Sequence, residues 1–175
     1  KAQHPKIVNG IIDNAWVVQK AREKCEVLTE RGRTVYYANV PDIGTNVEIT
    51  SKGLTHGFAR PTDRNSNGST PNAITNARVI MAIPQILKNS IEVNRSQRGS
   101  NIDVPYTHVL IGTAALEGSN GTLEHYVVRS MVQERKNQDP VLVEANILGK
   151  LTSVNAKKID SPTTQVGENT VALVD

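Results

Sequence analysis

The chain has 175 residues, of which 38% are hydrophobic and 21% charged, enough for one domain that buries roughly 70% of its unfolded surface. Its single cysteine, Cys25, excludes an intramolecular disulfide, and no Cys/His set has zinc-finger spacing. We find no apolar run of about 18 residues and expect neither a membrane span nor a secretory leader. The chain begins at Lys1 rather than at methionine, so we expect a piece of a longer polypeptide.

The charge balance is mildly basic, with a formal net charge of +3 and a pI near 9.1. Such an excess permits a polyanionic partner but does not require one. Aromatic residues make up only 3% of the chain, whereas proteins that bind single strands by base stacking need several exposed rings. If nucleic acid is the partner, phosphate contacts must carry the interaction.

We expect one domain between two tails, with boundaries at residues 1–13, 14–159 and 160–175. The first element is a helix from Asn14 that ends at Gly32, where a glycine tolerates positive φ. Its apolar positions follow helical spacing and are Val17, Ala21, Cys25 and Leu28.

Two strands at residues 34–40 and 46–51 are predicted next, joined as a hairpin by a Pro/Asp/Gly connection. Residues 60–72 are polar and read as a loop. A helix then begins with Thr70 as its cap and Pro71 at its first position, and Pro84 should break or kink it near Ile83.

A second polar loop is expected at residues 94–103. The last third predicts three longer strands, at 106–113, 122–132 and 141–148, separated by strong turn signals. The stretch 151–154 is either a fourth strand or a continuation past Gly149. This order of elements predicts an α+β fold, with N-terminal helices packed on one face of a four- to five-stranded antiparallel sheet.

His56 is the strongest candidate for chemistry. It lies between Gly53 and Gly57, which allow close backbone approach or positive φ, with Lys52 four residues before it and Arg60 four residues after. An imidazole beside cations suits proton transfer at a phosphate ester. An exposed basic turn with no function explains the same spacing equally well.

The other candidates have simpler explanations. His4 falls in the expected tail, and His108 and His125 fit half-exposed strand positions. Cys25 fits a small core residue better than a nucleophile. No phosphate-binding P-loop, no Gly-x-Ser-x-Gly elbow and no metal-ligand spacing is present, so we expect no metal and no cofactor.

The order of these motifs resembles a known family. A charged helix and a hairpin precede Ile49-Thr-Ser-Lys-Gly-Leu-Thr-His56, then come Ile83-Pro-Gln-Ile-Leu-Lys-Asn89 and His125-Tyr-Val-Val-Arg129. The pattern resembles the phage-associated domains of large polyvalent proteins, relatives of the barnase/EndoU/colicin/RelE-like ribonuclease superfamily. The resemblance covers roughly residues 14–155, and its sharpest element is the Ser-Lys-Gly-x-x-His stretch.

That resemblance implies a metal-independent endoribonuclease, a toxin domain cut from a larger phage or bacterial protein. Carried over residue by residue, the family's histidine falls on His56, its lysine on Lys52 and its strand arginine on Arg129. The polar residues near the last strand fall on Thr152 and Ser153.

We therefore hypothesise that His56 takes the proton of a ribose 2′-hydroxyl that attacks the adjacent phosphorus. Lys52 and Arg129 would stabilise the phosphorane, and Thr152 or Ser153 would donate a hydrogen bond to a non-bridging oxygen. Tyr126 or a second protonated group would be the acid at the leaving group. The candidate RNA-binding cations are Arg60, Arg95 and Arg98.

Two alternatives stay open. The domain could be a catalytically inactive interaction or nucleic-acid-binding module of a polyvalent phage protein, or it could act on another nucleotide in the same basic cleft. If it is an enzyme, we expect it to act in the cytoplasm of a target or host cell, with an acidic immunity or antitoxin protein as a partner.

Overall fold

The computed structural model of the protein describes residues 4–57, 71–97, 106–118 and 120–151. The helices within these ranges are α1 (Asn14–Arg22), α2 (Ser51–Thr55) and α3 (Pro71–Lys88), with a 3₁₀ turn, η1, at Pro41–Ile43. The strands are β1 (Ile7–Val8), β2 (Ile11–Ile12), β3 (Glu26–Glu30), β4 (Arg33–Val40), β5 (Thr45–Glu48), β6 (Ile91–Gln97), β7 (Tyr106–Glu117), β8 (Leu123–Arg135) and β9 (Gln138–Leu151).

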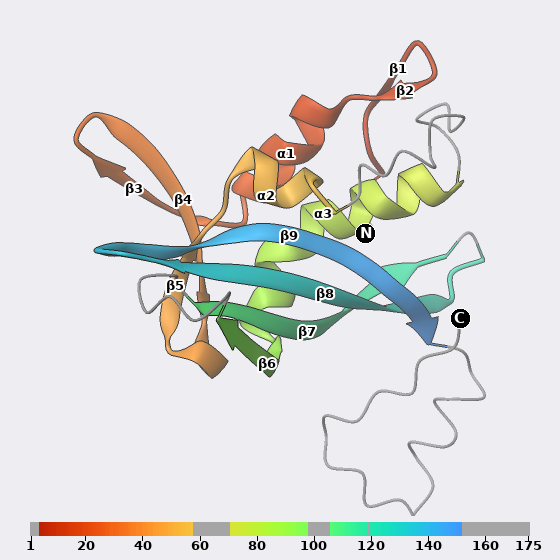
Figure 1. Ribbon diagram of the computed structural model, residues 1–175. Helices are drawn as coiled ribbons and strands as arrows, with labels where there is room; N and C mark the ends of the chain where they lie inside the picture. The colour runs from red at the N-terminus through yellow and green to blue at the C-terminus, as the bar shows by residue number, and fades with distance from the viewer. Residues whose placement is uncertain (1–3, 58–70, 98–105, 119, 152–175) are drawn as a thin grey trace, which may run out of the picture.

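Seven of these strands form one sheet in the order β3-β4-β5-β9-β8-β7-β6 (Figure 1). Neighbouring strands run antiparallel except at the centre, where β5 and β9 pair in parallel through Glu48 and Val141. The strands β1 and β2 form a separate small hairpin near the N-terminus.

The predicted fold class is therefore wrong. The described sheet has seven strands rather than four or five, and it is mixed rather than antiparallel. The helices are not gathered at the N-terminus, because α2 and α3 lie between β5 and β6 in the chain.

The main cause of the error is the first predicted helix. It ends at Arg22, and β3 follows and pairs with β4. Between these two strands Arg31 and Gly32 both have positive φ, of 50° and 75°, the geometry of a two-residue hairpin turn. The apolar spacing at Cys25 and Leu28 fitted a helix, but pairing with β4 decides the structure of this segment.

Two further local predictions fail. Residues 94–97 belong to the edge strand β6 rather than to a loop, since their backbone pairs with β7. The helix α3 is not broken near Ile83 but continues through Pro84 to Lys88. Burial of Ile83, Ile86 and Leu87 offsets the hydrogen bond that the proline removes.

Other elements agree with the sequence-based expectation. The strands β4 and β5 form the predicted hairpin, closed by η1 and by Gly44 at φ 67°. The three long strands of the last third are present, and β9 runs past Gly149 to Leu151. No helix within the described ranges has both the length and the apolar character that crossing a bilayer requires.

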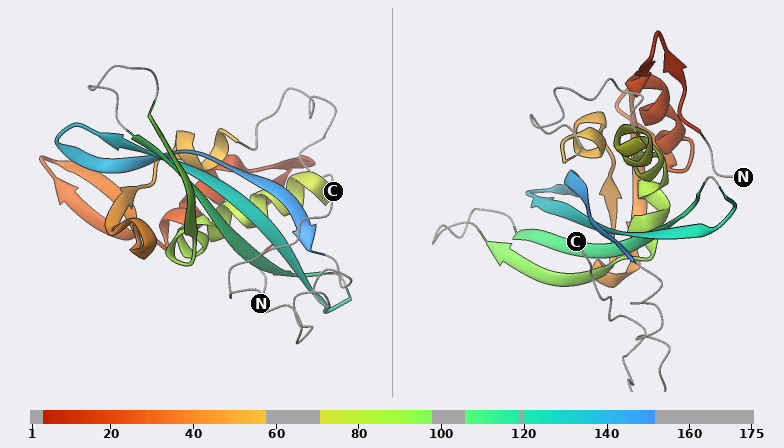
Figure 2. Two further views of the ribbon diagram at one scale, coloured as in Figure 1. Left: turned by 60° about the horizontal axis from the view of Figure 1, so that its bottom comes forward. Right: turned by 90° about the vertical axis from the view of Figure 1, so that its right-hand side faces the viewer.

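The sheet has two unlike faces (Figure 2). The main core lies between one face and the helices α1 and α3, with Val17, Ile83, Val132 and Leu142 among its fully buried side chains. No described helix covers the other face, which we call the open face. Strand alternation places Arg129 on it, because Val128 and Ser130 on either side are completely buried.

Candidate functional site

The short helix α2 is built to lie against β9. The Thr50 hydroxyl caps it by accepting a hydrogen bond from the Gly53 N–H at 3.0 Å. A Cβ atom at Gly53 would lie 2.0 Å from the Leu142 carbonyl oxygen, and one at Gly57 would lie 1.9 Å from that of Ala145. Neither glycine has positive φ, so both are required for close approach alone.

The carbonyl contacts locate α2 at an edge. Strand carbonyls point along the plane of a sheet toward the neighbouring strand. Contacts to the oxygens of Leu142 and Ala145 therefore place α2 beside β9, where a further strand would pair, as a continuation of β5 (Figure 1).

The helical period shows on which side of α2 the His56 side chain lies. Leu54 is completely buried in the main core. Lys52 and His56 are both exposed, and at 100° per residue they lie on the side of α2 opposite Leu54. They therefore point away from the helix-covered core, into solvent beside the β9 edge.

Glu144 links this helix end to the open face. Its Cγ atom lies 3.0 Å from the position of a Cβ at Gly57, so the side chain is next to the C-terminal end of α2. Glu144 pairs in register with Met131, and Asn146 pairs with Arg129. Both pairs lie on the open face by strand alternation.

Arg129 lies one strand further into the sheet. Its Nε donates a hydrogen bond to the Asn146 Oδ1 at 3.2 Å, and Asn146 is 6% exposed. Adjacent strands are about 5 Å apart, so Arg129 is separated from α2 by β9 alone. We call Lys52, His56, Arg129, Glu144 and Asn146 the edge site.

The charges of the edge site are available to a ligand. Within the described part of the chain, Lys52, His56 and Glu144 form no side-chain hydrogen bond or ion pair. The guanidinium of Arg129 uses one of its five N–H donors on Asn146. The edge site thus carries two cations, an imidazole and a carboxylate.

Tyr126 and Arg95 are not part of this arrangement. Tyr126 faces the helix-covered side and donates a hydrogen bond to the Glu124 Oε2 at 2.7 Å. Burial and this bond raise the pKa of the phenol above its ordinary value. Arg95 lies on β6, at the opposite edge of the sheet, paired with Glu92 at 3.0 Å.

Four other predicted site residues, Arg60, Arg98, Thr152 and Ser153, lie outside the described residues. Among the remaining histidines, His4 and His125 are exposed. Cys25 is partly buried, and this burial raises the pKa of its thiol to about 11, which opposes a role as nucleophile.

His108 differs from its prediction as a half-exposed residue. It is 3% exposed on the helix-covered face, where its ring nitrogens contact the carboxylates of Glu92 and Glu134. Burial raises the pKa of Glu92, but hydrogen bonds from His108 and Arg95 outweigh it, and the net pKa is below the ordinary value. This cluster lies near β6, away from the edge site.

Sequence reasoning did not single out Glu144 and Asn146 as site residues. A signal was present, because both are polar and interrupt the apolar run 141–148 at a spacing of two residues. That spacing puts two strand residues on one face. A strand buried on both faces would carry no such pair.

Within the described ranges, no group of three or more His, Cys, Asp or Glu side chains is arranged to hold a metal ion. No family model, no curated protein and no solved structure matches the chain.

Proposed function

We propose that the protein is an endoribonuclease and that the edge site cleaves RNA by attack of a ribose 2′-hydroxyl on the neighbouring phosphorus. One observation carries the proposal: α2, which exposes His56 and Lys52, ends next to Glu144 on β9, one strand away from Arg129. The resemblance of the Ser-Lys-Gly-x-x-His stretch to barnase/EndoU/colicin/RelE-like ribonucleases agrees with it.

The cations supply binding and charge stabilisation. The transition state of phosphoryl transfer carries its negative charge on the non-bridging oxygens, and positioned cations stabilise it. Arg129 is held by Asn146, so its guanidinium is oriented before substrate binds. Lys52 is one helical turn from His56 and contributes a second positive charge beside the imidazole.

The reaction needs two proton transfers, and the position of Glu144 suggests how they are shared. At neutral pH a carboxylate is a base and an imidazolium is an acid. Glu144 takes the proton of the 2′-hydroxyl as the 2′-oxygen bonds to phosphorus. The bond from phosphorus to the 5′-oxygen breaks, and His56 gives that oxygen a proton. In this proposal His56, rather than Tyr126, is the acid at the leaving group, because Tyr126 faces the helix-covered side of the sheet.

Product chemistry tests this proposal. The substrate is a DNA oligonucleotide with one ribose, compared with the all-DNA version, both in EDTA. We expect cleavage only beside the ribose, giving a 2′,3′-cyclic phosphate and a 5′-hydroxyl that mass spectrometry identifies. Cleavage of the all-DNA oligonucleotide, or products with a 5′-phosphate, would contradict 2′-hydroxyl attack.

A cellular test separates the enzyme from the inactive binding module. The proposed enzyme acts on cytoplasmic RNA of a target or host cell, so intracellular expression should stop growth. His56→Ala should restore it. An acidic immunity or antitoxin protein that covers the basic edge site should restore growth as well. A module that only binds would be equally tolerated with and without His56.

A further inference from the structure

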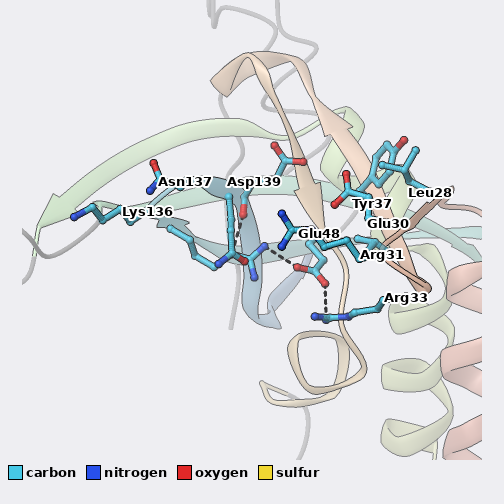
Figure 3. A pocket seen from close by; sticks show the side chains of 12 residues that line it. Leu28, Glu30, Arg31, Arg33, Tyr37, Glu48, Lys136, Asn137 and Asp139 are labelled. Atoms are coloured by element: carbon cyan, nitrogen blue, oxygen red, sulfur yellow. Dashed lines mark hydrogen bonds and ion pairs between the residues drawn. The ribbon is translucent and has the colours of Figure 1, made fainter.

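A second concave site lies on the open face, between the tips of two hairpins. It is a pocket of about 1240 Å³ between the β3–β4 hairpin and the β8–β9 hairpin (Figure 3). Its lining comes from both hairpins and from the end of β5: Leu28, Glu30, Arg31, Arg33, Val35, Tyr37, Glu48, Arg135, Lys136, Asn137, Gln138 and Asp139. We call it the hairpin pocket.

A buried carboxylate organises its arginines. Glu48, only 7% exposed, accepts from the Arg33 Nη2 at 3.1 Å and from the Arg135 Nη2 at 2.6 Å (Figure 3). Arg135 also donates its Nε to the Asp139 carbonyl oxygen at 2.8 Å. Two bonds fix this guanidinium, and three of its five N–H donors are left for a ligand.

The remaining charges favour an anion. Arg31 and Lys136 add two cations to the lining, where Glu30 and Asp139 are the carboxylates other than Glu48. Among the described residues, neither Arg31 nor Lys136 forms an ion pair with those carboxylates. Oriented guanidiniums with spare donors match the oxygens of a phosphodiester.

The pocket also offers a surface for a base. Tyr37 is half-buried, pairs in register with Glu48 and shares the open face with it. An aromatic ring beside fixed guanidiniums is the combination on which unpaired bases stack. The low aromatic content of the chain predicted that base stacking is not used. A single ring in the right position is, however, sufficient to stack one base.

The pocket and the edge site lie along the same strand. Glu48 pairs with Val141 of β9, and Glu144 follows three residues later, about 10 Å further at 3.3 Å per residue. The hairpin pocket is on the open face, as are the strand residues of the edge site, Arg129, Glu144 and Asn146. We propose that the hairpin pocket is a substrate subsite, which holds a phosphate and the adjoining unpaired base of the RNA strand that the edge site cleaves. This inference rests on the proposed function and identifies single-stranded RNA as the substrate class.

Binding of an uncleavable strand tests the subsite directly. The probe is a fluorescent 2′-O-methyl octanucleotide, whose blocked 2′-oxygen cannot attack. We expect Arg33→Ala and Lys136→Ala each to weaken binding about 5- to 30-fold and to lower the slope of log K against log salt by about 1. Lys6→Ala, an exposed cation outside the pocket, is the matched control and should bind as wild type does.

Two further measurements distinguish the subsite from a general charge effect. Tyr37→Leu should weaken octanucleotide binding without a change in the salt slope, because it removes stacking and no charge. Arg33→Ala should lower kcat/KM for an RNA octanucleotide and leave that for a dinucleotide, which cannot reach the pocket, unchanged. Equal losses for both substrates, or octanucleotide binding equal to that of Lys6→Ala, would overturn the inference.

Failure of the proposed function would give a different result. In that case the wild-type protein binds the octanucleotide but leaves RNA intact. The octanucleotide affinities of the pocket variants and of Lys6→Ala then decide whether the pocket holds the strand. If the wild-type protein does not bind the octanucleotide, the subsite does not exist.

Discussion

Gly57 lies so close to Ala145 that a Cβ atom on the glycine would be 1.9 Å from the alanine carbonyl oxygen. No side chain fits at that distance, and the clashing atom belongs to the backbone of β9. The residue before Gly57 is His56, the group on which the proposed chemistry depends. The contact between α2 and β9 therefore sets the position of the imidazole.

We expect Gly57→Ala to displace α2 from β9. Overpacking of this kind costs about 1–3 kcal/mol, so the free energy of unfolding in urea should fall by that amount. RNA cleavage should fall further than stability explains, because the imidazole moves with the helix. Thr55→Ala in the same helix is the control, since the Thr55 hydroxyl donates a hydrogen bond to the Ser51 carbonyl oxygen. Gly57→Ala protein with unchanged stability and activity would refute the close approach.

The prediction for Arg129 separates an effect of the edge site from an effect of overall charge. Arg129→Ala removes a cation from the edge site, and kcat/KM for RNA should fall about 10²- to 10³-fold, as for other groups that stabilise transition-state charge. Arg95→Ala removes a cation from β6 at the far edge and should leave cleavage unchanged. Comparable losses in the two variants would show that overall charge, rather than the edge site, governs activity.

The His108 cluster predicts a dependence of stability on acid pH. The folded-state pKa of Glu92 lies below its ordinary value, since hydrogen bonds from His108 and Arg95 outweigh the effect of burial. The Glu92 carboxylate therefore contributes its full stabilisation of the folded state above about pH 4.3. This stabilisation is lost as the pH falls through the lowered pKa of Glu92. Urea unfolding of Glu92→Gln should show a weaker decline over that acid range than wild type, and parallel curves would contradict the linkage.

How far the sequence predicts this fold depends on the kind of signal. Hydrophobic alternation and turn residues identified β4, β5 and the three long strands, because these signals are local. Local spacing misassigned β3, since a run that reads Glu-Val-Leu-Thr-Glu is compatible with a helix. Only its partner β4, reached through the turn at Arg31 and Gly32, makes it a strand.

The mixed sheet could not be predicted from local patterns. The parallel pairing of β5 with β9 joins Glu48 to Val141, residues nearly a hundred positions apart, and no periodicity reports such a contact. The same pairing brings α2 to the edge of β9. It therefore also decides which polar residues accompany His56.

The candidate site was predicted in part. Sequence spacing singled out Lys52 and His56, and the two glycines beside them proved to be close contacts with β9. Glu144 and Asn146 required the sheet register, and the hairpin pocket required the tertiary fold, because its arginines are 102 positions apart, at 33 and 135. Tyr126 could have been set aside from the sequence, since strand alternation alone puts it on the face opposite Arg129.

The most direct test of the edge site is single-turnover cleavage of an RNA octanucleotide by wild type, His56→Ala and Glu144→Gln. Removal of a proton-transfer group should slow the chemical step about 10²- to 10⁴-fold. Neither substitution disturbs the core, since His56 is exposed and Glu144 is half-buried. The circular dichroism spectrum and the octanucleotide affinity of both variants should therefore stay close to those of wild type. Cleavage by folded His56→Ala protein at the wild-type rate would contradict the account.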